Sequence, residues 1–150
     1  MKRPAPAVFV VSVFLLLLDR ALKALVFRRW AEGESHPVFP GVFHLTRVNN
    51  DGAAFGILKG STPFLAAVSA ACALALSWIL FARPPASSPK TAALALLLAG
   101  ALGNLYDRLR YGYVLDFIDL RVWPVFNVAD ACITTGAVLL VLSALIGRQR

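Results

Sequence analysis

Four long apolar runs dominate this chain and limit the folds that it can adopt. They cover approximately residues 7–27, 64–82, 91–108 and 125–146. With its flanks, each run is close to the roughly 20 residues that an α-helix needs to cross the hydrocarbon core of a bilayer. Hydrophobic residues make up 59% of the 150 residues, more than a soluble domain of this size carries. We therefore predict a single membrane domain over residues 1–150, all-α within the membrane, with four transmembrane helices.

The first run begins like a signal peptide, because Lys2 and Arg3 precede a leucine-rich segment. No small-x-small cleavage site follows it, which favours a retained membrane helix. Asp19 and Lys23 are four residues apart, so a continuing helix places them on one face in the favourable order. The simplest interpretation is an ion pair at the membrane interface, where the helix ends.

The basic residues bear on partners and on orientation. A net charge of +7 could indicate nucleic-acid binding, but no binding motif accompanies it, so we expect no nucleic-acid partner. Four crossings place both termini on one side of the membrane. Lys and Arg are densest near the termini and in the 83–90 loop, which favours the cytoplasm for both termini under the positive-inside rule. The opposite side also carries basic residues, over longer connections, so the counts alone do not decide.

The segment 38–60 is neither helix-like nor lipid-like. Residues 42–48 are rich in β-branched and aromatic side chains, 49–52 (NNDG) have strong turn chemistry, and 53–58 could return as a second strand. We predict a small β-sheet at the membrane surface. It could be a structural connector, or an exposed strand edge that binds an extended peptide by main-chain pairing.

Seven of the eight acidic residues, all but Asp19, fall on the side opposite the termini. Two Asn-x-x-Asp motifs, 104–107 and 127–130, each place an amide and a carboxylate on one helix face. Asp107 has Arg108 as its neighbour, and Asp119 has Arg121 nearby. The simplest interpretation of these two acids is structural pairing with those arginines.

Asp116 and Asp130 differ from the other acids. Asp116 lies within VLDFI, and Asp130 has no basic residue within eight positions. Unpaired acids in apolar surroundings have raised pKa values, and two such acids brought together can share one proton, as aspartic peptidases require. By themselves these residues leave two alternatives to a peptidase open, a small proton-coupled membrane transporter and a non-catalytic membrane scaffold. The two histidines, His36 and His44, are too isolated to predict a metal site.

Several motifs occur in a fixed order along the chain: Asp19 with Lys23, NDGAAF (50–55), GALGNLYDR (100–108), VLDFID (114–119) and FNVAD (126–130). In this order and spacing they resemble lipoprotein signal peptidase (signal peptidase II), a family of four-helix aspartic peptidases of the bacterial inner membrane. The chain departs from the family pattern at Ala99, Ala131 and Asp51. Asp51 adds an acid beside the expected peptide site.

The resemblance implies that Asp116 and Asp130 form the catalytic dyad. It implies further that four side chains orient the substrate or the dyad by hydrogen bonds: Asn50, Asn104, Arg108 and Asn127. The substrates would be diacylglyceryl-modified prolipoproteins, cut just before the lipidated cysteine on the periplasmic side. Membrane lipids and globomycin-type inhibitors would be the other partners. No metal or organic cofactor is implied.

Overall fold

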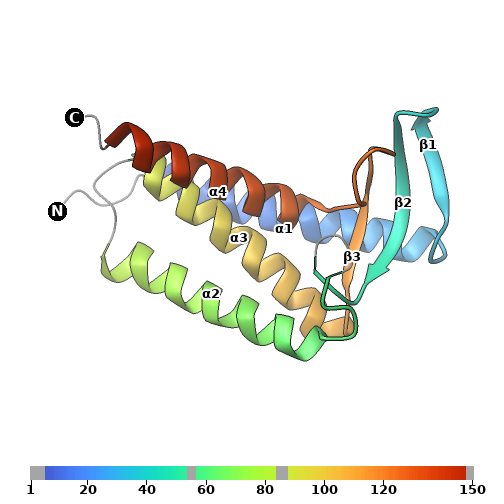
Figure 1. Ribbon diagram of the computed structural model, residues 1–150, viewed down its shortest axis with the longest axis horizontal. Coiled ribbons are helices and arrows are strands. Elements are labelled where there is room, and N and C mark those ends of the chain that lie inside the picture. Colours follow the sequence, from blue (N-terminus) through green and yellow to red (C-terminus); the bar gives the residue numbers. More distant parts are fainter. Residues whose placement is uncertain (1–5, 54–56, 84–87, 148–150) are drawn as a thin grey trace.

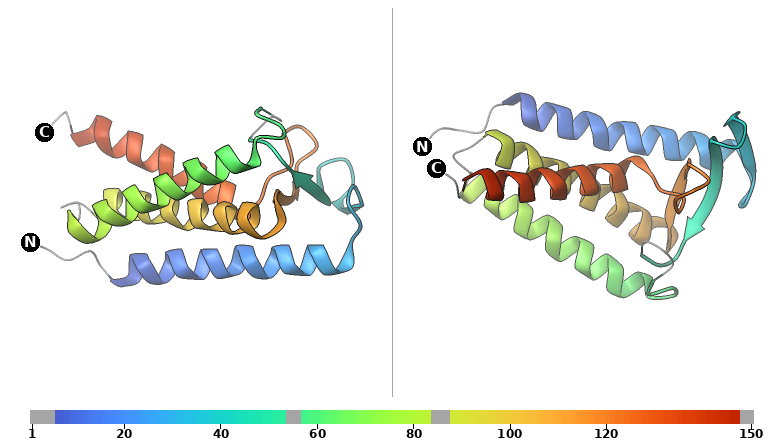
Figure 2. Two further views of the ribbon diagram at one scale, coloured as in Figure 1. Left: turned by 90° about the horizontal axis from the view of Figure 1, so that it is seen from below. Right: turned by 45° about the horizontal axis from the view of Figure 1, so that its top comes forward.

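The computed structural model describes residues 6–53, 57–83 and 88–147 as four long helices with a small sheet at one end (Figure 1). The elements, in chain order, are α1 (Pro6–Arg29), β1 (Ser35–Phe39), β2 (Phe43–Asn50), α2 (Thr62–Ala82), α3 (Ser88–Tyr111), β3 (Val114–Asp119) and α4 (Val128–Gly147). The start of α1 and the end of α4 lie at the end of the helices opposite to the sheet (Figure 2).

Three helices within the described residues are long and apolar enough to cross a membrane: Thr62–Ala82, Pro89–Tyr111 and Val128–Ile146. α1 is as long, but three charged side chains, Asp19, Arg20 and Lys23, interrupt its apolar sequence. Its crossing therefore stays a prediction. The mostly helical membrane architecture with a small sheet agrees with the sequence analysis.

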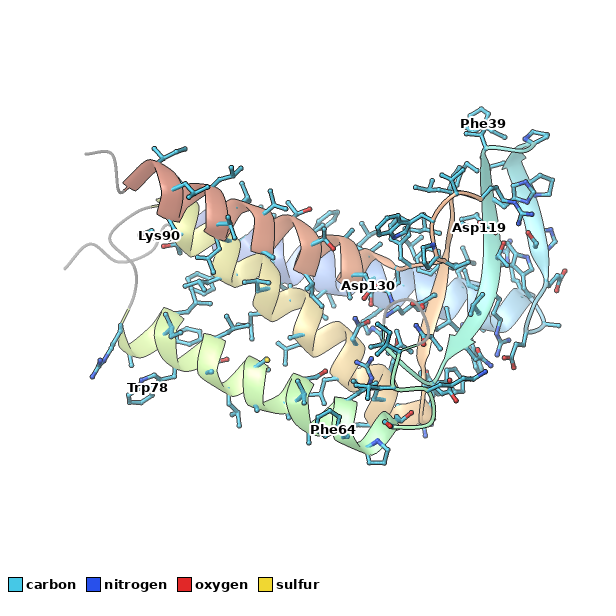
Figure 3. All side chains as sticks on the ribbon, viewed as in Figure 1. Phe39, Phe64, Trp78, Lys90, Asp119 and Asp130 are labelled. Carbon is cyan, nitrogen blue, oxygen red and sulfur yellow. The ribbon has the colours of Figure 1, made fainter. Side chains whose placement is uncertain are left out.

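Apolar side chains face outward from the helices, and polar ones lie inside. Trp78 and Phe64 project from the outer side of α2 (Figure 3) and are 64% and 58% exposed. By contrast, Asp107 and Asn127 are fully buried. Lipid can cover exposed apolar side chains, whereas buried polar groups need partners within the protein. This distribution is that of a membrane protein with an internal polar site.

Glycines let α3 approach its neighbours closely. A Cβ atom added to Gly100 would collide with the backbone oxygen of Ala129 in α4. One added to Gly103 would lie 3.0 Å from the Ala129 Cβ atom and 3.2 Å from Asp19 Oδ2 in α1. The helices α1, α3 and α4 therefore pack closely together at Gly103, next to the buried Asp19 carboxylate.

The sheet has the antiparallel order β1-β2-β3. β1 and β2 form a hairpin that turns at Gly41, whose φ of +76° suits glycine. The sequence predicted that residues 53–58 return as a strand beside β2, and the described residues of this segment do not form one. Ala53, Ile57 and Leu58 lie in bends and turns, residues 54–56 lie outside the described part, and the partner of β2 is β3, more than sixty residues further along.

β3 is buried on both faces, which explains why it lacks an alternating pattern. Leu115 and Phe117 pack against Val26 of α1 in one apolar cluster. Asp116 points from the opposite face, because successive side chains of a strand alternate. The strand therefore uses its apolar residues to attach to α1 and carries one acid into the interior.

Candidate active site

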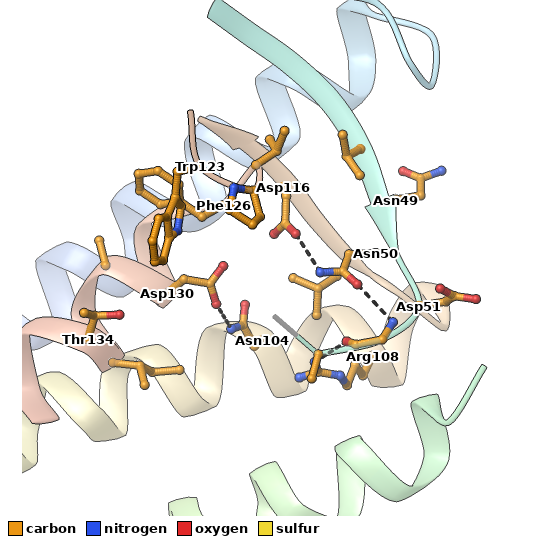
Figure 4. Close-up of a pocket in the computed structure, with 18 of the residues that line it drawn as sticks. Asn49, Asn50, Asp51, Asn104, Arg108, Asp116, Trp123, Phe126, Asp130 and Thr134 are labelled. Atoms are coloured by element: carbon orange, nitrogen blue, oxygen red, sulfur yellow. Dashed lines mark hydrogen bonds between the residues drawn. The ribbon is translucent and has the colours of Figure 1, made fainter. Parts of the chain in front are cut away.

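Asp116 and Asp130 line the same cavity, which has a volume of about 1040 Å³. Figure 4 shows their carboxylates directed toward a common space between β3 and the first turn of α4. Three further predicted site residues line the cavity: Asn50, Asn104 and Arg108. The fourth, Asn127, bonds to both acids from behind.

The pairing of β2 with β3 positions Asp116. Val48 lies opposite Asp116, and Asn50, two residues further along, is on the same face of the sheet. The Asn50 Nδ2 atom donates to Asp116 Oδ2 over 2.9 Å. The Asn50 Oδ1 atom in turn accepts from the backbone N–H of Gly52 over 3.0 Å, which closes a tight turn and holds the amide in this orientation.

A helix cap positions Asp130. The loop after β3 returns so that Phe126 pairs with Ile118, and α4 begins two residues later. The Asn127 Oδ1 atom accepts from the Asp130 backbone N–H over 2.9 Å, and Asp130 Oδ2 accepts from the Asn127 N–H over 3.2 Å. This reciprocal pair is a capping box. The second Asn-x-x-Asp motif, 127–130, therefore forms the N-terminal cap of α4 and does not lie within a continuous helix.

Asn127 joins the two acids. Its Nδ2 atom donates to Asp116 Oδ1 over 2.6 Å and to Asn104 Oδ1 over 3.3 Å. Its side-chain oxygen accepts from the Asp130 backbone N–H, and its own backbone N–H donates to the Asp130 carboxylate. The polar groups of this buried residue are therefore nearly all hydrogen-bonded. Asn104 completes the arrangement by donating from Nδ2 to Asp130 Oδ1 over 2.7 Å.

The surroundings of Asp116 favour its protonated form. Burial, and then the nearby Asp130 carboxylate, raise its pKa to about 7, although hydrogen bonds from Asn50 and Asn127 and the charge of Lys23 act in the opposite direction. A carboxyl group that titrates near neutral pH beside a second one suits acid–base chemistry. The sequence analysis predicted a raised pKa at this position for the same two physical reasons.

The Arg108 side chain lines the cavity and does not pair with the carboxylate of Asp107. Its Nη2 atom donates to the backbone oxygen of Gly52 over 3.1 Å, and its Nη1 atom lies 3.4 Å from Ser69 Oγ. The predicted pairing of Asp107 with Arg108 is therefore wrong. Arg108 instead ties the turn after β2 to α3 and to α2, where its guanidinium lines the cavity.

Asp107 belongs to a buried ionic cluster that the sequence analysis did not predict. It pairs with Arg20, and with the Lys23 Nζ atom over 2.8 Å. Asp19 pairs with Lys23 over 3.0 Å, as its spacing predicted, but the pair does not mark the end of a helix at an interface. α1 continues to Arg29, and Asp19 and Lys23 are only 1% and 4% exposed. No local signal in the sequence connects α1 with Asp107.

Asp119 stays outside the cavity, on the same strand as Asp116. Arg121 Nη1 lies 3.0 Å from Asp119 Oδ2, so the predicted pairing with Arg121 is confirmed. Thr46 also donates to Asp119, over 2.8 Å. Asp51, the acid that departs from the family pattern, lines the cavity.

Comparisons with known proteins agree with the motif pattern. A family model described as signal peptidase (SPase) II matches residues 11–146. The lipoprotein signal peptidase of Halothermothrix orenii is 44% identical over 135 residues, which cover 90% of this chain and 92% of that protein. The lipoprotein signal peptidase of Pelotomaculum thermopropionicum is 45% identical over 132 residues, which cover 88% of this chain and 87% of that protein.

Two solved structures have the same fold. Both are described as a bacterial membrane enzyme determined by the in meso method, at 2.3 and 1.9 Å resolution. Each is 32% identical to this chain, with TM-scores of 0.89 and 0.85. The matches cover 96% of this chain in both cases, and 91% and 96% of the solved chains. This chain is accordingly an integral membrane protein.

Proposed function

The chain belongs to the signal peptidase II family and removes signal peptides from prolipoproteins, and we propose that it does so as an aspartic endopeptidase with Asp116 and Asp130 as its catalytic pair. One observation carries this proposal. Both carboxylates line one cavity, and one buried residue, Asn127, donates to both of them, to Asp116 from its side-chain Nδ2 atom and to Asp130 from its backbone N–H. A proton-coupled transporter or a scaffold is not favoured, since the family and its named relatives are peptidases.

In this mechanism one carboxylate takes a proton from a water molecule, and the oxygen of that water attacks the carbonyl carbon of the scissile peptide bond. The other, protonated carboxyl group hydrogen-bonds to the carbonyl oxygen and polarises it. The C–N bond of the resulting tetrahedral intermediate then breaks, and the leaving amine takes up the proton that the first carboxylate received from water. The pKa of about 7 at Asp116 supports a pair that retains one proton at neutral pH. Asn104 and Asn127 orient the dyad, while Asn50 and Arg108 bind the substrate.

The position of the cavity fits a substrate that is anchored in lipid. Its lining extends from Asn50 in the sheet to Thr134 and Thr135 in α4, a candidate membrane span. A diacylglyceryl-modified cysteine keeps its acyl chains in the bilayer, so the bond just before that cysteine is held near the membrane surface. Asp116 and Asp130 meet at this level, where the membrane helices end and the sheet begins. Globomycin-type inhibitors would occupy the same cavity.

The charges of α1 are compatible with a fourth crossing. Asp19 and Lys23 are buried against each other and against α3, so lipid does not have to solvate them. With four crossings, both termini lie in the cytoplasm, and the sheet and cavity lie on the periplasmic side of the inner membrane. Membrane lipids then cover the apolar outer faces of the helices.

Cleavage of a purified, diacylglyceryl-modified precursor tests the assignment. Asp116→Asn and Asp130→Asn should each abolish cleavage while the detergent-purified protein remains folded, because each removes an ionisable group that the mechanism requires. Asp119→Asn is the matched control on the same strand and should lose much less activity. Near-normal turnover by either dyad variant would contradict the assignment, and a wild-type protein that does not cleave the precursor would favour a transporter or scaffold.

A further inference from the structure

Lys23 is a buried cation whose ammonium group contacts three polar side chains. The Nζ atom lies 3.0 Å from Asp19 Oδ2, 2.8 Å from Asp107 Oδ2 and 3.4 Å from Asn104 Oδ1. The lysine side chain is only 4% exposed. Neutralising buried carboxylates accounts for two of these contacts, but it does not account for the contact with an amide.

The two carboxylates that Lys23 binds each hold the backbone next to a catalytic acid. Asp19 Oδ1 accepts from the N–H of Ala129, the residue before Asp130, over 3.1 Å. Asp107 Oδ2 accepts from the N–H of Leu115, the residue before Asp116, over 3.3 Å. One ammonium group therefore links the backbone supports of both acids, although these acids lie on different elements.

The Asn104 oxygen accepts from two donors, Lys23 Nζ and Asn127 Nδ2, which together fix the orientation of that amide. An ammonium group can only donate hydrogen bonds, so Asn104 must turn its oxygen toward Lys23. Its NH₂ group then faces Asp130, where Nδ2 lies 2.7 Å from Oδ1. With the amide reversed, NH₂ would face the ammonium group, and Asp130 would meet the lone pairs of an oxygen.

We propose that Lys23 is a positioning residue for the catalytic pair, which orients the Asn104 amide toward Asp130 and joins the backbone supports of both aspartates. The inference rests on the proposed roles of Asp116 and Asp130. It predicts that loss of the ammonium group affects the chemical step more than substrate binding, because Asn50 and Arg108 do not depend on Lys23.

Arg20 provides a matched control within the same cluster. Its guanidinium pairs with the same two acids, Asp19 and Asp107. It does so from the outer side, where the side chain is 21% exposed and lies 4.7 Å from the centre of the Tyr106 ring. Arg20→Met and Lys23→Met thus each remove one positive charge from the same pair of carboxylates, but only Lys23→Met also removes a donor to the Asn104 oxygen.

The experiment measures kcat and KM of the detergent-purified variants on a diacylglyceryl-modified precursor, together with their melting temperatures. Lys23→Met should lower kcat by about 10- to 100-fold with KM changed less than about threefold, the loss that one or two misplaced hydrogen bonds produce. Arg20→Met should lower the melting temperature while kcat per folded molecule stays close to wild type. Equal losses of kcat in the two variants, or a normal kcat in Lys23→Met, would overturn the inference.

A double-mutant cycle tests whether Lys23 acts on the catalytic pair through Asn104. In an Asn104→Ala background, Lys23→Met should lower kcat far less than in the wild type, because the amide that it orients is already gone. Full additivity would overturn the proposed route through Asn104. If Lys23→Met alone does not fold, the charge-balanced variant Lys23→Met/Asp107→Asn takes its place, with the same expected loss of kcat and with Asp107→Asn as its reference.

The outcome is separable from that of the proposed function. If Asp116→Asn and Asp130→Asn are inactive while Lys23→Met keeps its kcat, the catalytic assignment stands and only the positioning role of Lys23 fails. If either dyad variant still cleaves the precursor, the catalytic assignment fails whatever Lys23→Met does.

Discussion

Asp116→Asn should make the free energy of unfolding less dependent on pH, and it should also abolish cleavage. The wild-type carboxyl group is 1% exposed, and burial together with the Asp130 charge raises its pKa from 3.8 to about 7. Between these two values the folded protein binds a proton that the unfolded chain does not. Stability therefore falls as the pH rises through this interval and becomes constant above about pH 7.

The size of the effect follows from the interval. One pH unit within it corresponds to about 1.4 kcal/mol, so the wild type should lose roughly 3 kcal/mol of unfolding free energy between about pH 5 and pH 8. For a chain of this length, each kcal/mol corresponds to about 2–4 °C in melting temperature. Asparagine does not ionise and should remove this dependence. Asn50 and Asn127 donate to different oxygens of Asp116, so the NH₂ group of the new asparagine faces one of these two donors, which costs about 1–3 kcal/mol at every pH.

Thermal unfolding of both proteins in one detergent at pH 5 and pH 8 measures this difference. Asp119→Asn is the control, because hydrogen bonds from Thr46 and Arg121 outweigh burial and lower the pKa of Asp119. Its stabilising contribution is present above its unfolded pKa, so this variant should lose the same stability at pH 5 and pH 8. An Asp116→Asn variant with the pH dependence of the wild type would refute the reasoning.

Two further predictions concern the cavity and the orientation of the chain. Asn50→Ala should lower kcat/KM by about one to two decades, because it removes a hydrogen bond to Asp116 and a donor toward the substrate. Asn49→Ala is the control: Asn49 also lines the cavity, but its side chain donates to Glu32 and not to Asp116, so this variant should keep its specific activity. Equal losses would contradict a binding role for Asn50. Reporter fusions at the C-terminus and in the 84–89 loop should report the cytoplasm, and a fusion at Ser35 should report the periplasm. The opposite pattern would place the cavity on the wrong side of the membrane for exported precursors.

The helices and the polar candidates were predictable because their causes are local. Apolar length indicates a membrane helix wherever it occurs, and α2 illustrates this with charged residues absent from Thr62–Ala82. Asp130 could be singled out because its neighbours in the sequence are apolar. The Asp19–Lys23 pair could be predicted because helix geometry alone brings residues four apart together.

Other features depend on contacts between distant segments. β3 lacks an alternating apolar–polar pattern because both of its faces are buried, so nothing local predicts that it pairs with β2. The partners of Asp107 lie on α1, more than eighty residues earlier. Its adjacent arginine was the only partner that the sequence could suggest, and that suggestion failed because Arg108 points to the turn at Gly52.

Each acid is placed by a separate local device, and a second set of contacts relates the two. The register of a strand places Asp116, and a helix cap places Asp130. Neither device determines the other, so a small change in the loop between them could move one acid away from its partner. Asn127 opposes such a change directly, since its side chain donates to the Asp116 carboxylate and its backbone N–H donates to the Asp130 carboxylate. Lys23 opposes it through Asp19 and Asp107, whose other contacts hold the backbone next to each acid, so the charges of α1 have partners within the protein.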